Sequence, residues 1–286
     1  MLIRGAQEFQ GQIGLITYDL VPKIREQSDS SSDYLNKMAI VTLTFEENSY
    51  LPEWIEFHQK MGVDHFFIYD QNPNRDLRTL LRSQVESNIV TIVPWPNIWG
   101  ISSQTLAYAH CISSHWQSFR WMMLTDIDEF VFPKYEDNLK TCLGKYDDYS
   151  AIYLYWRCFG SSGHDDPPSG YVIRNYTEMG LEPEDPWLKH EMSRIKAIVD
   201  PARCSQVRTH GCLVDGEILD NPHDILLNHY ITRSRQEFIR KIDPSKDLWM
   251  WGTQFESWRK KRIAIFEHLE SKYEENREIL RVDPFG

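Results

Sequence analysis

The sequence predicts an α/β fold with a mixed, mostly parallel central sheet and helices on both of its faces. From residue 38 to residue 130, short apolar runs rich in β-branched residues alternate with segments of helical period. Such alternation is typical of strand–helix–strand units, whose strands pair in parallel. After residue 130 several strand-like runs follow one another without helices, which indicates added strands of mixed direction.

Each early element has its own signal. Residues 38–43 (MAIVTL) form a short apolar run typical of a buried strand. Residues 53–61 have helical period, with Trp54 and Phe57 on one face, and Gly62 ends the helix. The next predicted elements are a strand at 65–69, a polar turn at 70–74, a helix to about residue 85, and a strand at 89–94.

Ser102 or Ser103 caps the next predicted helix, which runs to about residue 119. The apolar run 121–124 then forms a strand that ends in the acidic cluster 126–129. The later predicted elements are strands at 151–159, 171–176, 195–199 and 207–214, a helix capped by Ser234 and ending at about Lys241, and a long amphipathic helix at 253–281.

The composition limits the class of protein. With 31 basic and 42 acidic residues the net charge is −11, and no basic block is present, so broad capture of nucleic acid is excluded. The five cysteines never stand in a CxxC spacing, which indicates reduced thiols in a reducing compartment. We therefore expect a soluble, cytoplasmic chain, and the sequence leaves its oligomeric state open.

Residues 1–37 end in SDSSSD and are predicted to be an extension, flexible in solution, which precedes a domain at 38–245 and a C-terminal helical segment at 246–286. No secretory signal is visible. The uncharged stretch 87–119 contains Asn, Gln, His and two prolines, so no membrane span is expected in this chain.

The sharpest chemical signal is the pair Asp126 and Asp128. Two aspartates separated by one residue at the end of an apolar strand can aim both carboxylates at one divalent ion, while Ile127 points into the core. Such an ion keeps positions open for diphosphate oxygens. The alternative is that both aspartates only end the strand and cap the next segment.

Several segments share one resemblance. They are similar, in order, to glycosyltransferases of family 92 and their bacterial family 2-like relatives, which have the GT-A (nucleotide-diphospho-sugar transferase) fold. The matching segments are residues 46–72, QTLAYAHC (104–111), WMMLTDIDEFVFP (121–133), WRCFGSSGHDDPPSGYVIRNYT (156–177), IKAIVDP (195–201) with His210, and NHYITRSRQEFIRK (228–241).

The resemblance implies a hexosyltransferase that moves a sugar, galactose in this family, from a UDP-sugar donor to a glycan hydroxyl with inversion. It implies Mn²⁺ or Mg²⁺ as cofactor, bound by Asp126 and Asp128. It also implies donor contacts from Glu46, Asp70 and Gln104, although Glu46-Glu47 replaces the Asn-Glu usual in the family.

A late histidine completes the metal shell in many enzymes of this fold. Both His210 and His229 lie in matching segments, and we favour His210.

The catalytic base should come from a different segment than the metal ligands. The loop FGSSGHDDPPSG offers Asp165 and Asp166, with His164 to orient them, and it lacks the G-x-S-x-G of a nucleophilic serine. Glu184 and Asp185 are the reserve candidates.

Two other functions were considered. A haloacid-dehalogenase-type phosphohydrolase also uses Asp-x-Asp after a strand, but it needs Thr or Val where this chain has Phe130. A glycan-binding module that keeps the fold without turnover is the second alternative.

Overall fold

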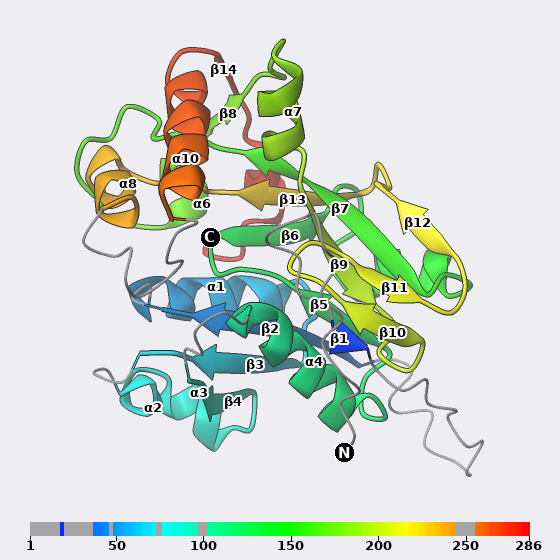
Figure 1. The fold of residues 1–286 in the computed structure, drawn as a ribbon. Coiled ribbons are helices and arrows are strands. Elements are labelled where there is room, and N and C mark those ends of the chain that lie inside the picture. The colour runs from blue at the N-terminus through cyan, green and yellow to red at the C-terminus, as the bar shows by residue number, and fades with distance from the viewer. Residues whose placement is uncertain (1–17, 20–36, 46–47, 73–75, 97–101, 244–254) are drawn as a thin grey trace. The chain divides into compact units, whose positions relative to one another are not determined.

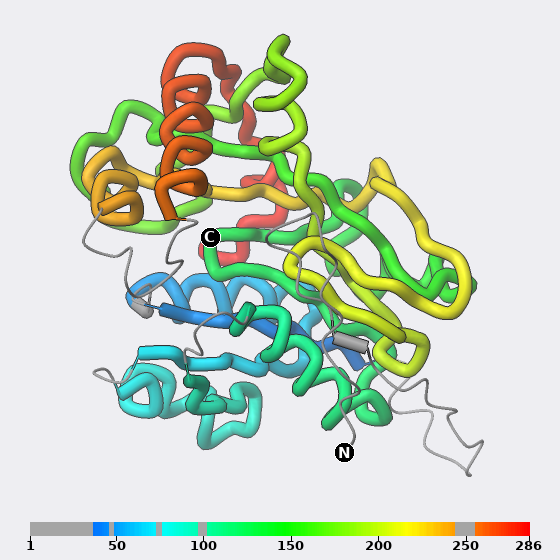
Figure 2. Tube along the Cα trace, viewed as in Figure 1, coloured from blue at the N-terminus to red at the C-terminus, as the bar shows by residue number. Residues whose placement is uncertain are grey.

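The computed structural model describes residues 18–19, 37–45, 48–72, 76–96, 102–243 and 255–286. Its residues form two compact units, which are treated separately. Unit 1 takes its described residues from Met1–Ile127, Pro133–Leu154 and Ile195–Ile225, and unit 2 from Asp128–Phe132, Tyr155–Arg194 and Leu226–Gly286. Figure 1 labels the helices and strands, and Figure 2 traces the chain by residue number. The domain boundaries expected from the sequence stay a prediction.

Unit 1 is built on a mixed sheet. Its strands are β2 (Met38–Thr44), β3 (His65–Asp70), β4 (Val90–Pro94), β5 (Trp121–Leu124) and β9 (Ile195–Val199). Their order is β4-β3-β2-β5-β9, with β9 antiparallel to β5 and the other pairs parallel. The predicted mixed, mostly parallel α/β fold is therefore confirmed.

Helices cover both faces of this sheet. Phe66 and Phe67 are successive residues of β3, so their side chains point to opposite faces. The ring of Phe66 lies 5.6 Å from Trp54 of α1 (Leu51–Lys60), whereas the ring of Phe67 stacks at 4.3 Å on His115 of α4 (Ser103–His115). Because each face meets a different helix, both faces of β3 are buried, which explains its continuous apolar sequence.

The ends of these helices follow the sequence signals. Gly62 has φ +94° directly after α1, as expected for a residue that stops a helix in the left-handed region. Ser102 caps α4, where its hydroxyl accepts a hydrogen bond from the amide of Thr105. The predicted helix before residue 85 is interrupted at Leu81, and it forms α2 (Leu77–Leu80) and α3 (Arg82–Glu86).

Other elements of unit 1 extend this framework. The predicted strand 207–214 is instead a hairpin, whose turn contains Gly211 at φ +95°. The strand β7 contributes its first four residues to unit 1 and its last four to unit 2. The bounds are β1 Tyr18–Asp19, α5 Leu139–Leu143, β7 Ala151–Cys158, β10 Cys204–Val207, β11 Cys212–Val214 and β12 Ile218–Asp220, with 3-10 helices at Asn48–Tyr50 and Gly144–Tyr146.

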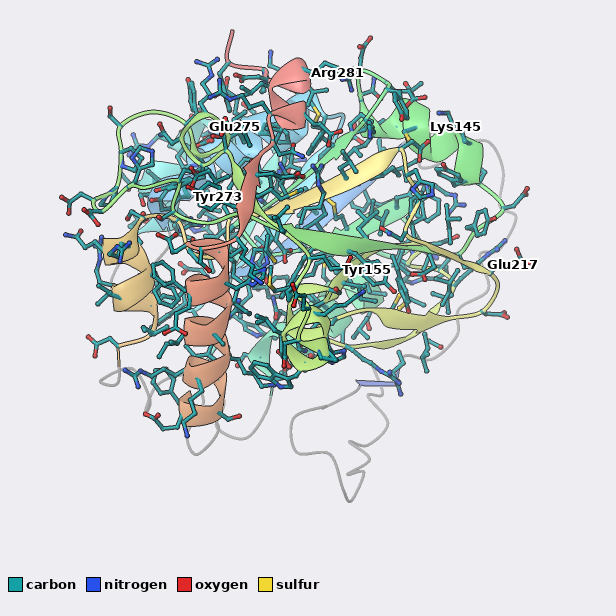
Figure 3. The ribbon with its side chains drawn as sticks, turned by 90° about the horizontal axis from the view of Figure 1, so that it is seen from above. Lys145, Tyr155, Glu217, Tyr273, Glu275 and Arg281 are labelled. Atoms are coloured by element: carbon teal, nitrogen blue, oxygen red, sulfur yellow. The ribbon has the colours of Figure 1, made fainter. Side chains whose placement is uncertain are left out.

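Unit 2 contains the end of β7 paired in parallel with β13, and β6 beside β13. β6 follows the acidic motif directly and was not expected as a strand. Figure 3 shows Tyr273 and Glu275 on β14, which pairs antiparallel with β8. The bounds are β6 Glu129–Pro133, α6 Val172–Asn175, β8 Glu178–Gly180, α7 Pro186–Met192, β13 Ile225–His229, α8 Arg235–Lys241, α10 Phe255–Leu269, β14 Tyr273–Glu275 and a 3-10 helix at Glu278–Val282.

Two predictions in unit 2 were wrong. Residues 171–176 form the helical turn α6 rather than a strand, because both Val172 and Ile173 are buried, and a strand would turn neighbouring side chains to opposite faces. The long C-terminal helix ends at Leu269, where the chain leaves it to pair with β8. The start of that helix, at residue 253, lies outside the described residues.

No helix in the described part of the chain has both the length and the apolar character needed to cross a bilayer. The five cysteines are buried free thiols.

His58 provides a test of the packing around α1. Its ring is fully buried between Trp54 and Phe57, and burial lowers its pKa from 6.5 to about 3 despite a hydrogen bond to the carbonyl of Trp54. Between about pH 6.5 and pH 3, His58 binds a proton in the unfolded chain but not in the folded protein. The free energy of unfolding therefore falls as the pH drops from 6.5 towards 3.

We therefore expect the wild type to lose about 2 kcal/mol more stability between pH 7 and pH 5 than His58→Leu does. Urea unfolding of both proteins at the two pH values measures the difference. Equal losses would mean that His58 is not held neutral in the folded state.

Candidate functional site

The parallel strands of unit 1 end at one edge of the sheet, which is where ligands gather in α/β folds. Asp70 is the last residue of β3, Asp126 follows the end of β5 by two residues, and Gln104 opens α4. Glu46, expected to contact the donor, lies outside the described residues.

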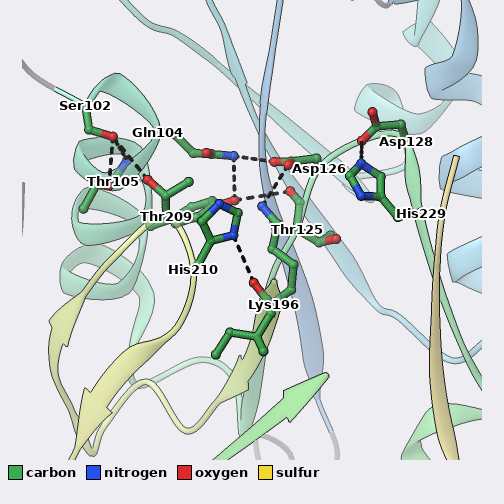
Figure 4. Close-up of polar contacts among 12 residues, drawn as sticks. Ser102, Gln104, Thr105, Thr125, Asp126, Asp128, Lys196, Thr209, His210 and His229 are labelled. Atoms are coloured by element: carbon green, nitrogen blue, oxygen red, sulfur yellow. Dashed lines mark hydrogen bonds and ion pairs between the residues drawn. The ribbon is translucent and has the colours of Figure 1, made fainter. Parts of the chain in front are cut away.

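Asp126 is held by two groups of unit 1 (Figure 4). The side-chain amide of Gln104 donates to its Oδ1 and also to the hydroxyl of Tyr108, at 2.9 Å. The ammonium of Lys196 donates to its Oδ2 at 2.8 Å. The predicted neighbours Gln104 and Asp126 are therefore brought together, and Lys196 joins them.

Lys196 is the second residue of the otherwise apolar strand β9, and its side chain is only 1% exposed. A buried ammonium is costly unless a carboxylate faces it. Asp126 supplies that carboxylate and is itself 31% exposed, so one side of its charge remains open to solvent. The ion pair fixes the position of Asp126 while leaving it accessible to a ligand.

Asp70 forms a turn at the end of β3. Its Oδ1 accepts a hydrogen bond from the backbone amide of Asn72 at 2.9 Å. Partial burial raises the pKa of Asp70 above its usual value, and the Asn72 hydrogen bond opposes this only in part.

The second motif residue belongs to unit 2. Asp128 lies in a buried group with Glu129 and His229, and their ligand atoms all lie within 4.8 Å of one another. The Nε2 atom of His229 is 3.4 Å from Oδ1 of Asp128 (Figure 4). The backbone amide of Tyr230 donates to the carbonyl of Asp128 at 2.8 Å, and the ring of Trp156 packs on His229 at 4.2 Å.

The protonation states of Asp128 and His229 suit a metal ion. Burial lowers the pKa of His229 to about 4, although Asp128 raises it, so the imidazole is neutral at pH 7. Burial raises the pKa of Asp128, but the charges of Lys241 and Arg233 and a hydrogen bond from His229 outweigh burial and hold it well below its usual value. The group thus offers an ionised carboxylate and a neutral imidazole, a donor set that manganese-like ions accept.

The second ring nitrogen of His229 also bears on whether this group fits a metal ion. The Nδ1 atom of His229 is buried and makes no hydrogen bond with any described residue. Packing by Trp156 fixes the ring with Nε2 towards Asp128, and the buried Nδ1 is a polar atom for which a cation could be the partner.

Lys241 approaches Asp128 from α8. Its ammonium is 2.8 Å from Oδ2 of Asp128 and 3.4 Å from the carbonyl of Ile231. The helix begins with a capping box, in which Ser234 and Glu237 exchange side-chain and backbone hydrogen bonds. This cap fixes the start of α8, and Lys241 is its last residue.

His210 lies in unit 1, in the turn between β10 and β11. Its Nδ1 atom is 3.1 Å from the carbonyl of Ile195, and the adjacent Thr209 contacts Ser102 and Thr105 at the start of α4. Its role as a metal ligand stays a prediction, whereas the structure places the alternative, His229, beside a motif aspartate.

The loop with the predicted catalytic base docks on the start of α8. The amides of Arg235 and Gln236 donate to the carbonyls of His164 and Asp165. Nε of Arg235 lies 3.1 Å from Oδ1 of Asp165, and the side chain of Gln236 donates to Asp166 at 2.9 Å. The side chain of Asp165 is 85% exposed, so it is open to solvent.

His164 turns away from these carboxylates, because its Nε2 lies 3.2 Å from the carbonyl of Asn175. The reserve residues are separate from this loop: Asp185 caps α7, and Glu184 is 94% exposed. Helix α8 therefore carries the loop at its first turn and Lys241 at its last, about 9 Å apart along the helix axis at 1.5 Å per residue.

Sequence analysis missed Lys196, Glu129 and Lys241. Lys196 had a usable signal, since the lysine of the run IKAIV is an ionisable residue in an otherwise apolar strand. Lys241 had no such signal in the sequence, because it lies on a short charged helix more than one hundred residues from Asp128.

The chain thus combines an α/β sheet, an acidic motif after an inner strand, and a buried acid–histidine group. The family model for glycosyltransferase family 92 matches residues 38–278. The chain belongs to glycosyltransferase family 92.

Curated relatives match parts of the chain. A family 92 protein of Oryza sativa subsp. japonica is 32% identical over 170 residues, which cover 58% of this chain and 27% of the relative. One from Ricinus communis is 27% identical over 218 residues, covering 72% and 37%. The chain thus spans well under half the length of these relatives.

Among solved structures, S. aureus TarS 1-349 in complex with UDP-GlcNAc is similar with a TM-score of 0.39 and 10% identity. The match covers 82% of this chain and 73% of that one.

The Lys196–Asp126 pair can be tested by a double-mutant cycle. Asp126→Asn takes the carboxylate away from a buried ammonium, so we expect it to lower the free energy of unfolding by about 1–3 kcal/mol, the cost of a buried donor that loses its partner. Adding Lys196→Met removes the ammonium and should recover part of this loss. Denaturant unfolding of the single and double variants measures the coupling, and strictly additive losses would contradict it.

Proposed function

We propose that this chain is a metal-dependent glycosyltransferase that moves a sugar from a UDP-sugar to a hydroxyl group of a glycan. The observation that carries the proposal is the motif after β5, where Asp128 lies with Glu129 and His229 in one buried group. Membership of glycosyltransferase family 92 supports the class of reaction. The family also favours galactose as the transferred sugar and inversion at its anomeric carbon.

Asp128, Glu129 and His229 would hold Mn²⁺ or Mg²⁺, with His210 as a second candidate ligand. When bound, the ion supplies positive charge that stabilises the departing diphosphate. The protein holds Asp128 ionised and His229 neutral, so both can serve as ligands near pH 7 without first losing a proton.

The nucleotide would be contacted by Asp70, Gln104 and Asp126 in unit 1, and by Glu46. Asp126 is fixed by Lys196 and remains partly exposed, so it can accept hydrogen bonds from donor hydroxyls. Gln104 has both an amide donor and a carbonyl acceptor and stands beside it.

An inverting transfer needs a base that removes the proton from the acceptor hydroxyl. Asp165 and Asp166 are our candidates, because they are carboxylates on a loop that the start of α8 holds in place. Arg235 lies beside Asp165, with its Nε atom 3.1 Å from Oδ1, and helps to hold this carboxylate in place. His164 supports the loop through its backbone carbonyl, which accepts from the amide of Arg235.

The reaction class can be tested by measuring UDP release from UDP-galactose with Mn²⁺, with and without glycan acceptors. Acceptor-stimulated release of UDP supports the transferase. Release of inorganic phosphate from phosphomonoesters would indicate a phosphohydrolase, and glycan binding without turnover would indicate a binding module.

We predict that UDP stabilises the protein only when a divalent ion is present. A ligand at one hundred times its dissociation constant adds about 2.7 kcal/mol to the stability of the folded state. Thermal unfolding with UDP, in Mn²⁺ or in EDTA, measures this effect. Asp128→Asn and His229→Ala should lose the Mn²⁺-dependent part, and loss in His210→Ala with retention in His229→Ala would show that our ligand set is wrong.

We also predict that amide replacement of the true base lowers transfer by about 10²–10⁴-fold while UDP and Mn²⁺ binding stay unchanged. Asp165→Asn and Asp166→Asn are the variants, and Glu256→Gln is the control, since Glu256 is a 60% exposed carboxylate elsewhere in unit 2. Normal transfer by both loop variants would exclude this loop as the source of the base.

A further inference from the structure

The carboxylate of Asp128 already faces a cation of the protein itself. Its Oδ2 atom is 2.8 Å from the ammonium of Lys241, and its Oδ1 atom is 3.4 Å from Nε2 of His229. The side chain of Asp128 is 5% exposed, and that of Lys241 is 26% exposed. The carboxylate of Asp128 is therefore shielded from water, while part of the Lys241 side chain is in contact with solvent.

The charges around Asp128 are balanced without a metal ion. Arg233 also acts electrostatically on Asp128, and it is 6% exposed. The two formal negative charges of Asp128 and Glu129 are thus offset by the positive charges of Lys241 and Arg233, and Arg262 adds a positive charge that acts on the neutral His229. A divalent ion that enters alone finds no net attraction and must share Asp128 with an ammonium.

We propose that Lys241 is an internal counter-ion that competes with the divalent ion for Asp128 and couples metal binding to diphosphate binding. This inference rests on the proposed function. When the ion takes Asp128, the ammonium of Lys241 loses its carboxylate, and an anionic diphosphate then provides a new partner for it. Lysine suits this role, because its ammonium is a compact charge on a flexible stem.

The consequence is a thermodynamic linkage. Metal alone binds weakly because it displaces Lys241, and it binds more tightly once UDP supplies negative charge for the displaced ammonium. By reciprocity, Mn²⁺ strengthens UDP binding by the same factor. Removing the ammonium should therefore improve binding of Mn²⁺ alone and reduce the factor by which UDP improves it.

The experiment is calorimetric titration of Mn²⁺ into the whole chain, with and without saturating UDP. In Lys241→Met we expect Mn²⁺ alone to bind about tenfold more tightly than in the wild type, the lower end of the range for a hydrogen bond between charged groups. The enhancement by UDP should shrink by a similar factor. Lys241→Arg keeps the positive charge and should stay close to the wild type.

Lys261→Met is the matched control. Lys261 makes the same kind of contact, 2.8 Å from Oε1 of Glu191 and 33% exposed, in the same unit but without a motif residue. It should leave both Mn²⁺ titrations unchanged. Thermal unfolding verifies that each variant is folded, and Lys241→Gln provides a second neutral variant.

Unchanged or weaker Mn²⁺ binding in the folded Lys241 variants would overturn the inference, as would an equal change in Lys261→Met. Failure of the proposed function looks different: the wild type would then bind no Mn²⁺ even with UDP, or Asp128→Asn would bind it as well as the wild type.

Discussion

The buried, ionised carboxylate of Asp128 is the constraint on which the candidate metal group depends. At 4% exposure it has lost most of its hydration, so cations must stand at fixed positions around it. This explains why the short helix α8 starts with a full capping box: the register of the helix decides whether Lys241 reaches the carboxylate. It also explains why Trp156 packs on His229 and fixes the imidazole ring.

The two aspartates of the motif are only two residues apart, yet their partners come from different units. Asp126 is held by Gln104 and Lys196 in unit 1, and Asp128 by His229 and Lys241 in unit 2. Each carboxylate is therefore held by its own hydrogen-bond and ion-pair partners. The two aspartates thus differ in their protein contacts, and their joint binding of one divalent ion stays a prediction.

Sequence patterns predicted the helices and strands that depend mainly on the types of neighbouring residues. The apolar run of β2 and the positive φ of Gly62 follow from residue type, and both were expected. The turn at Val172 was missed because tertiary burial of adjacent side chains overrode a strand-like composition. The motif aspartates were found from their spacing after an apolar strand, and Gln104 through a family-like segment. Lys196 and Lys241 could not be assigned partners, since their ion pairs join residues 70 and 113 positions apart in the chain.

Helix α8 acts as a spacer of fixed length. One added or removed residue would turn Lys241 by about 100° around the helix axis and move it about 1.5 Å along it. The number of residues between Ser234 and Lys241 is thus more constrained than their identity, since Ile239 is 57% exposed and Arg240 also faces solvent. Over evolutionary time, this segment should accept substitutions on its outer face and reject insertions or deletions.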